Sequence, residues 1–418
     1  MAGFRLAIDS LSPPFVHRKD FIQEYLLARS VAAGANPYLP LPQLSAQFNV
    51  GAPHEIFPHP APYPPPLALF SLPLALLNYE RAAAAWLIFE LFCLLASTAL
   101  LVGWMRPKAA LSAALLAAWA ALGWAHVWEE LVTGQVNALL LLLLALAWRA
   151  LRGEKQIAGG ILLGTVIALK IIAWPLTLFL LVRRKLAGAT AAVATFATAN
   201  LLAGALMGWA AVIEYYVRVG PAVMSLYRAH IRNLSLWGVG WRLFSGTGSP
   251  VLAGIQAPPL IHAPSVASLM GYCLPVVTLA ICLWLTAKMK SFDSGYGLMI
   301  CVSLLISPLL WSHYLIILAI PAVILARLLY DSKFPKAERK MAMIAGLLLL
   351  VPSAALLKIV SGFTVEGGET EYATVPFAAT LFSLIPTIAA LLCVVLIYRL
   401  SRLVDQARSQ KDSGNLDG

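Results

Sequence analysis

Charged residues are scarce in this chain of 418 residues. They make up only 12% of it, whereas hydrophobic residues make up 60%, and the mean hydropathy is +0.81. A soluble domain carries about twice that share of charged residues, so this composition excludes an ordinary soluble protein. The sequence therefore predicts an all-α, polytopic integral membrane protein, because helices satisfy their own backbone hydrogen bonds in lipid.

Cysteine and metal-binding motifs are also missing or rare. The five cysteines all lie inside apolar runs and none belongs to a CxxC pair, so we interpret them as small buried hydrophobic side chains. The sequence has no HExxH motif, no EF-hand loop, no DxD pair in its first loop, and no P-loop or GxGxxG between a strand and a helix. We therefore expect neither a metal site nor cytosolic nucleotide chemistry.

The net charge of +11 does not indicate a nucleic-acid-binding protein. The basic residues fall in short clusters between apolar runs, which is the pattern of cytoplasmic loops. Crossing a bilayer takes about 20 apolar residues, or slightly fewer inside a bundle, and on this basis we predict nine spans. They lie near 82–104, 109–127, 136–151, 187–207, 266–287, 295–311, 313–330, 341–360 and 376–398.

Residues 157–182 need a different arrangement, because basic residues flank them on both sides. Lys155 precedes the segment and a cluster starting at Arg183 follows it, so it has to enter and leave the membrane on the same face. Lys170 and Pro175 interrupt it, and two half-helices of about 13 residues each reach only about 20 Å. We predict a re-entrant helical hairpin with Lys170 at its apex. The alternative is one long kinked span in which Lys170 snorkels.

With this hairpin, three polar segments face the extracytoplasmic side together: residues 1–81, residues 208–264 and an acidic loop at 366–371. Polar groups from distant positions then meet on one face, which favours a site there. The predicted domains are an extracytoplasmic N-terminal loop with interfacial helices over 1–81, a helical bundle over 82–400 with its hairpin at 157–182 and its loop at 208–264, and a cytoplasmic tail over 401–418.

The first residues carry no apolar segment ahead of Asp20, so no obvious signal carries residues 1–81 across the membrane. Either this tail crosses with the first span as its signal, or the natural start of the chain lies upstream. We expect the latter.

Asp20 and Glu24 stand one turn apart in a helix predicted to run to about Ala33, where Gly34 ends it. Neighbouring carboxylates raise one of their two pKa values, which suits a general base that accepts a hydroxyl proton. A structural explanation is also open, because Asp20 followed by Gln23 fits a capping box with Asp20 as the N-cap. The local sequence alone favours the cap.

Three further polar residues are candidates for substrate binding. Gln135 and Asn137 offer amide groups to sugar hydroxyls where a loop enters the bundle, although helix capping explains them equally well. His313 lies between two short predicted spans and can donate a hydrogen bond to a phosphate. A structural histidine in a helix break is the alternative.

The loop after residue 207 places arginines among aromatic residues on the face that normally lacks positive charge. An interfacial belt explains the Tyr and Trp residues, but it does not explain Arg228, Arg232 and Arg242. Clustered arginine is the usual partner of phosphate, so these residues favour an anionic ligand.

Seven short motifs follow one another along residues 19–400. They are Asp20-Phe21 with Tyr25 one turn on, Gly34-Ala35-Asn36-Pro37-Tyr38, Tyr63-Pro64-Pro65-Pro66 before an apolar run, Gly134-Gln135-Val136-Asn137, Leu169-Lys170, Arg232-Asn233-Leu234-Ser235, and Ser307-Pro308 followed by Trp311, His313 and Tyr314. Together they resemble glycosyltransferase family 87, a group of membrane-embedded GT-C enzymes. Each motif is short, but seven in order make the resemblance fairly specific.

The resemblance implies a transferase that uses a polyprenyl-phosphate sugar, with mannose as the expected hexose, and inverts the anomeric carbon. It places the active site on the extracytoplasmic face of the cell membrane. The family's catalytic aspartate corresponds to Asp20, which would deprotonate the acceptor hydroxyl, and this outweighs the cap. The implied partners are the lipid-linked donor, a glycolipid or glycan acceptor and membrane lipid, with no metal, other cofactor or nucleic acid.

The resemblance also suggests which residues bind substrate. Lys170 and His313 match positions suited to the lipid phosphate and the leaving group, and Arg232 and Asn233 would join them. The full predicted substrate-binding set is Glu24, Gln135, Asn137, Lys170, Arg232, Asn233 and His313.

Two other classes of function remain open from the sequence. A transporter or flippase for lipid-linked sugars would also use an intramembrane Lys170 and broken helices, although the inverted repeat typical of such proteins is not visible. A non-catalytic subunit in cell-envelope assembly is the other alternative.

Overall fold

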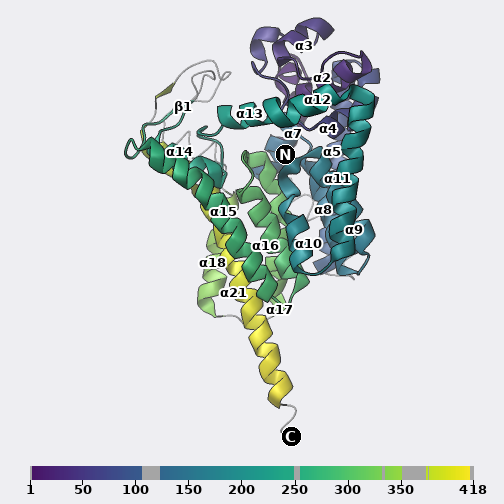
Figure 1. Ribbon diagram of the computed structural model, residues 1–418. Coiled ribbons are helices and arrows are strands. Elements are labelled where there is room, and N and C mark those ends of the chain that lie inside the picture. The colour runs from purple at the N-terminus through teal and green to yellow at the C-terminus, as the bar shows by residue number, and fades with distance from the viewer. Residues whose placement is uncertain are drawn as a thin grey trace.

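The computed structural model describes residues 2–105, 123–248, 255–331, 335–350, 373–374 and 376–414. Within these ranges the chain is almost entirely helical. Apart from turns and loops, the exceptions are two-residue strands, β1 (Ile255–Gln256) and β2 (Ala373–Thr374), which pair in parallel. Figure 1 shows long helices side by side, with the N-terminal helices at one end and the C-terminus at the other. The prediction of an all-helical polytopic membrane protein is confirmed.

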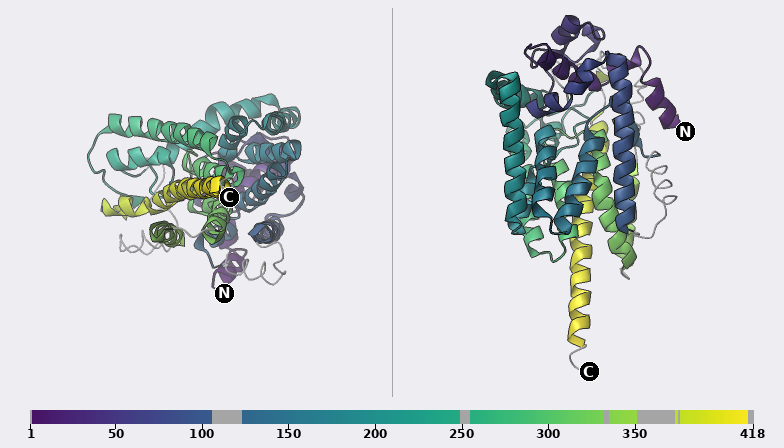
Figure 2. Two further views of the ribbon diagram at one scale, coloured as in Figure 1. Left: turned by 90° about the horizontal axis from the view of Figure 1, so that it is seen from below. Right: turned by 90° about the vertical axis from the view of Figure 1, so that its right-hand side faces the viewer.

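Short helices before residue 79 form a cap over one end of the bundle (Figure 2). The largest of them, α2, is buried along almost all its length, and Gly34 with φ +67° ends the helical segment as predicted. In chain order these helices are α1 (Ala2–Asp9), η1 (Phe15–Arg18), α2 (Phe21–Ala32), α3 (Leu41–Phe48), η2 (Pro53–Glu55), α4 (Pro65–Phe70) and η3 (Leu72–Leu76).

Five described helices are long and apolar enough to cross a membrane, and a bent pair adds a sixth if it is counted as one span. The bent pair consists of α7 (Ala125–Thr133) and α8 (Asn137–Arg152), which meet at 118°. The five are α5 (Tyr79–Met105), α11 (Leu186–Met207), α15 (Pro264–Lys288), η6 with α17 (Ser312–Leu318 and Ala319–Asp331), and α20 with α21 (Ala378–Ser383 and Ile385–Gly414).

The remaining helices are shorter, and α16 among them is buried along most of its length. They are α9 (Gln156–Leu169), η4 (Ile171–Ala173), α10 (Pro175–Val182), α12 (Trp209–Glu214), η5 (Tyr215–Val219), α13 (Gly220–Leu226), α14 (Leu236–Phe244), α16 (Phe292–Leu305) and α18 (Lys336–Leu350).

Predicted span boundaries agree with α8, α11 and α15 to within about two residues. The span predicted over 295–311 is too long, because α16 ends at Leu305 and the following residues leave the helix ahead of η6. The predicted spans 109–127 and 341–360 lie partly outside the described residues, and the acidic loop at 366–371 lies wholly outside them.

The two ends of the predicted hairpin lie at the same end of the bundle, as that prediction requires. Glu154 precedes α9 and Lys185 follows α10, yet the Lys185 ammonium donates to both Glu154 carboxylate oxygens at 2.8 Å, so both ends lie at the same end of the bundle. Backbone at Lys170 is extended, with φ −157°, and α10 starts at Pro175, where a missing N–H costs nothing. A Cβ on Gly160 would come within 2.2 Å of the Gly188 carbonyl oxygen, so α9 packs directly on α11.

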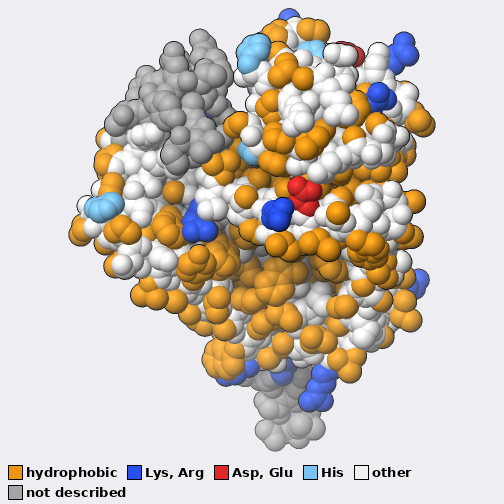
Figure 3. Space-filling view, turned by 45° about the horizontal axis from the view of Figure 1, so that its top comes forward, with side chains coloured by type: hydrophobic (Ala, Val, Ile, Leu, Met, Phe, Trp, Pro, Cys, Tyr) orange, Lys and Arg blue, Asp and Glu red, His pale blue; other side chains and the backbone are white. Residues whose placement is uncertain are grey.

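Large hydrophobic side chains cover much of the outside of the bundle. Figure 3 shows them over most of the visible lower surface, with Lys and Arg at its lower edge. Less than a quarter of the most apolar stretch of α11 or of α15 is buried in the protein, and exposed side chains include Leu206 and Val276. Such a surface suits lipid contact rather than water.

Candidate active site

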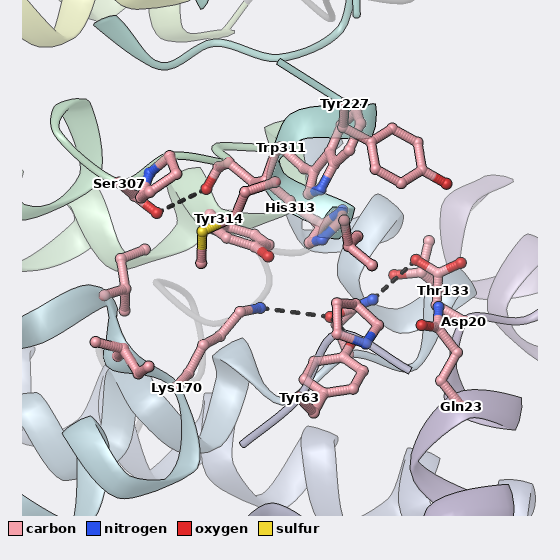
Figure 4. Close-up of a pocket in the computed structure, with 18 of the residues that line it drawn as sticks. Asp20, Gln23, Tyr63, Thr133, Lys170, Tyr227, Ser307, Trp311, His313 and Tyr314 are labelled. Carbon is pink, nitrogen blue, oxygen red and sulfur yellow. Dashed lines mark hydrogen bonds between the residues drawn. The ribbon is translucent and has the colours of Figure 1, made fainter. Parts of the chain in front are cut away.

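A cavity of about 440 Å³ lies between the N-terminal cap and the bundle. Segments far apart in the sequence line it: the cap supplies Asp20 and Tyr63, the turn before α8 supplies Gln135, the hairpin apex supplies Lys170, and the start of η6 supplies His313. Figure 4 shows Asp20 and Lys170 on opposite sides of this group. The predicted convergence of distant polar residues is therefore observed.

The turn between α7 and α8 depends on Gly134. Its φ of +73° lies in the left-handed region, and a Cβ there would sit 2.9 Å from the Phe21 Cβ, so a side chain would clash with the cap. Because the chain bends sharply here, Gln135 and Asn137 lie at the buried start of α8 and both reach Lys170.

Gln135 links the Asp20 carboxylate to the Lys170 ammonium across the cavity. Its Nε2 donates to Asp20 Oδ2 at 2.8 Å, while its Oε1 accepts a hydrogen bond from the Tyr63 hydroxyl at 2.6 Å and a longer one from Lys170 Nζ at 3.5 Å. A single amide therefore orients the Asp20 carboxylate and also faces the Lys170 ammonium.

Lys170 is 8% exposed, and its ammonium directly contacts an amide oxygen and an aromatic ring. It donates to Asn137 Oδ1 at 3.1 Å, and it lies 3.6 Å from the centre of the Tyr314 ring, a cation–π contact. These direct contacts are neutral and hold the ammonium in one position, where it can stabilise an anion in the cavity.

A buried carboxylate behind Lys170 completes this network. Glu130 in α7 is fully buried, and it accepts hydrogen bonds from Asn137 Nδ2 at 2.8 Å and from the Ala138 backbone N–H at 2.9 Å. Since both oxygens of Glu130 are engaged, Asn137 is fixed with its carbonyl oxygen toward Lys170.

Asp20 does not act as a capping side chain, so the capping-box interpretation is wrong. It occupies the N-cap position of α2, but its side chain makes no cap hydrogen bond, and the Gln23 side-chain oxygen is buried without a hydrogen-bond partner in the described chain. The physical reason is tertiary: Gln135, 115 residues away, donates to the carboxylate that would otherwise have served the helix end.

Glu24 lies behind Asp20 rather than in the cavity wall. It is fully buried, and neither carboxylate oxygen has a hydrogen-bond partner among the described residues. Burial raises the pKa of Glu24 to about 8, and the nearby Asp20 charge adds to that effect. Glu24 does not line the cavity, so the prediction that it binds substrate is wrong, and it is placed to act on Asp20 instead.

Two comparisons with known proteins bear on this site. The sequence profile of glycosyltransferase family 87 matches residues 62–308, more than half of the chain. The chain belongs to glycosyltransferase family 87. It is also similar to a polyprenol-phosphate-mannose-dependent alpha-(1-2)-phosphatidylinositol mannoside mannosyltransferase of Mycobacterium tuberculosis, with 27% identity over 293 residues.

That similarity covers 65% of this chain and 62% of the mycobacterial protein, so the chain spans less than two thirds of that relative. No solved structure matches the chain. The family 87 match begins at residue 62 and ends at 308, so Asp20 and His313 both lie outside it. Their assignment therefore rests on the geometry of the cavity.

Of the remaining predicted site residues of this family 87 protein, two line the cavity and one does not. His313 is 7% exposed, lines the cavity, and its Nε2 has no hydrogen-bond partner within the described residues. Half-buried Arg232 also lines the cavity. Asn233 does not: it is fully buried, its Nδ2 donates to the Pro308 carbonyl, and its Oδ1 accepts from the Leu310 backbone N–H. Its amide holds the 307–310 segment in place.

Of the three arginines that suggested an anionic ligand, only Arg232 faces the cavity. Arg228 stacks on Trp241 at 4.9 Å, and Arg242 is fully buried, where it donates to the Ile231 carbonyl and to Ser383 Oγ. The latter two stabilise the loop structurally.

Sequence reasoning missed several cavity residues. Tyr63 belongs to the Tyr-Pro-Pro-Pro motif, and a tyrosine ahead of a rigid proline run was the available signal. His59 gave no signal in the sequence. Its Nδ1 donates to the Pro60 carbonyl, because a carbonyl can only accept. Its Nε2 then carries no proton and accepts a hydrogen bond from the Tyr227 hydroxyl at 2.8 Å. Burial lowers the pKa of His59, which agrees with a neutral ring.

A metal site is not evident in the part of the chain that the structure describes. No group of three or more His, Cys, Asp or Glu side chains there is arranged to hold an ion.

Proposed function

We propose that this protein is a membrane-embedded glycosyltransferase that moves a hexose, with mannose as the expected sugar, from a polyprenyl-phosphate donor to a glycolipid or glycan acceptor. Family membership and the mycobacterial relative support the donor class. The observation that carries the proposal is the pair of Asp20 and Lys170, held on opposite sides of one cavity by the amide of Gln135.

This arrangement suits a single displacement. Asp20 would accept the proton of the acceptor hydroxyl as its oxygen bonds to the anomeric carbon, and the bond from that carbon to the phosphate oxygen would break on the opposite side. The leaving polyprenyl phosphate carries the negative charge away, and Lys170 with Arg232 would stabilise it. Attack and departure on opposite faces invert the anomeric carbon.

The charge distribution supports an extracytoplasmic position for the cavity. The basic loops at 149–155, 183–185 and 288–290 gather at the other end of the bundle, where Lys185 pairs with Glu154 and Arg183 donates to the Lys290 carbonyl. Basic loops mark the cytoplasmic side of the plasma membrane.

The proposal is tested with purified protein, a panel of polyprenyl-phosphate sugars and labelled acceptor glycolipids. We expect transfer from the mannose donor with inverted product configuration. Asp20→Asn should slow transfer by about 10²–10⁴-fold, because it removes the proton acceptor. Asp9→Asn, a change at an exposed aspartate of α1, is the matched control and should leave transfer unchanged.

Near-normal turnover by Asp20→Asn would disprove the base assignment. If no donor is turned over, movement of intact donor across a liposome bilayer would support the transporter hypothesis instead.

A further inference from the structure

A second cavity of about 370 Å³ lies at the other end of the bundle. It is formed where α5, α8 and α17 approach their C-terminal ends. Arg149 follows Asn137 by 12 residues along α8, so the two cavities are separated by about 18 Å of helix. Figure 2 shows these helices running from the cap toward the end that carries the C-terminus.

Three arginines line this second cavity: Arg149 and Arg152 from α8, and Arg327 from α17. Arg152 pairs with Asp293 at 3.0 Å, so its charge is compensated. Arg149 is exposed, and its side chain makes no hydrogen bond or ion pair to a described residue. The Arg149 charge is therefore uncompensated at this cavity.

Tryptophan provides the other polar group. The Trp104 ring lies under the Arg327 guanidinium at 4.6 Å and packs against Trp148 at 4.7 Å. Trp148 Nε1 donates to Asp293 at 3.0 Å, but Trp104 Nε1 is buried and has no hydrogen-bond partner among the described residues. A buried indole N–H without an acceptor costs free energy unless a ligand supplies one.

Arginines near helix C-termini also occur for structural reasons, because they neutralise the partial negative charge of the last carbonyls. Arg327 acts in this way, since it donates to the Trp104 carbonyl at 3.0 Å. This explanation does not account for the unpartnered Trp104 N–H or for Arg149, which contacts no such carbonyl in the described structure.

We propose that this second cavity binds the phosphate of an anionic membrane lipid headgroup. Guanidinium groups match phosphate oxygens in a planar, bidentate fashion, and the Trp104 N–H supplies a further donor. Leu100 and Leu101 line the cavity beside these polar groups, and α5 is a membrane-capable helix that ends here, so a lipid can place its chains along apolar surface and its phosphate among the arginines. This inference is independent of the proposed transferase activity.

The experiment uses the purified full chain in neutral detergent and measures bound lipid by native mass spectrometry. We expect phosphatidylglycerol to be retained at concentrations where phosphatidylcholine is not. Arg149→Gln should weaken retention about tenfold, the equivalent of about 1.4 kcal/mol. Arg402→Gln, which removes an exposed arginine of α21, is the matched control for net charge and should leave retention unchanged.

A second variant protects the test against misfolding. Trp104→Phe keeps the ring but removes the N–H, and it should also weaken retention, whereas the thermal melting of both variants reports folding. Equal retention of the two lipids, or wild-type retention by both Arg149→Gln and Trp104→Phe, would overturn the proposal. Displacement of the lipid by millimolar inorganic phosphate would overturn its lipid source and show that the site takes free phosphate.

Discussion

The two ends of α8 carry polar clusters of opposite kinds. At its start, Gln135 and Lys170 line the first cavity. Asn137 and Glu130 lie behind them, fully buried, so that carboxylates, amides and one ammonium form a connected network. At its far end, Arg149 and Arg152 are exposed, and the excess charge is all of one sign.

The difference follows from how strongly charge is solvated at each end. A buried charge has to be stabilised by fixed dipoles or opposite charges, because water cannot do it. Lys170 therefore sits among two amide oxygens and an aromatic ring, whereas Arg149 needs no such partners since it reaches solvent. The first cavity holds its charges in one geometry, which suits catalysis, and the second has adaptable cations, which suit binding.

Replacing Lys170, the cation of the first cavity, should lower transfer far more than replacing a cation at the other end of the bundle. Lys170→Met leaves the leaving phosphate without its ammonium, and we expect transfer to fall by about 10²–10³-fold, mostly in kcat. Lys288→Met, at an exposed lysine of the other end, should change transfer little. An activity of Lys170→Met within twofold of wild type would contradict the proposed role of this cation.

Gln135→Leu should have a smaller effect, because it removes the residue that positions Asp20 rather than the base itself. Losing a hydrogen bond to a charged group costs about 1.5–3 kcal/mol, so kcat/KM should fall by about 10–100-fold. The acidic limb of the pH–rate profile should also move to higher pH, because the Asp20 carboxylate loses a donor that favours its charged form.

Gln43→Leu, a change at an exposed glutamine of α3, is the control for Gln135→Leu. A purely structural role for Gln135 would lower the melting temperature without moving the pH profile, and this result would contradict a positioning role.

Glu24→Gln should affect stability more than rate. The folded-state pKa of Glu24 is raised to about 8, so the folded protein binds this proton more tightly than the unfolded chain does. Stability is therefore lost as the pH rises from about 4.5 to 8. The Gln variant cannot ionise, and its melting temperature should exceed that of wild type by several degrees at pH 8 but not at pH 5.

Glu80→Gln, at a half-exposed glutamate, provides the comparison for Glu24→Gln. An equal response of both variants to pH would show that the burial of Glu24 is not responsible.

The hairpin and the position of Lys170 could be predicted from the sequence, because they follow from chain length and from basic residues on both flanks of 157–182. The role of Asp20 could not be predicted from its neighbours. Local rules predict that the Asp20 side chain caps a helix. In the structure it accepts a hydrogen bond from Gln135, which is distant in the sequence. Glu130 was missed for the same reason, since its partner Asn137 lies beyond a sharp bend.

The sequence by itself determined that this protein lies in a membrane, where its helices run, and at which end of the bundle its basic loops gather. These properties depend on hydropathy, length and charge, which act locally or add along the chain. Only the tertiary structure decided which polar residues share a cavity and which hold the backbone, as with Lys170 and Asn233. The physical reason is that one hydrogen-bonding group can serve a helix end, a loop or a charge, and the choice depends on which partner packing brings within about 3 Å.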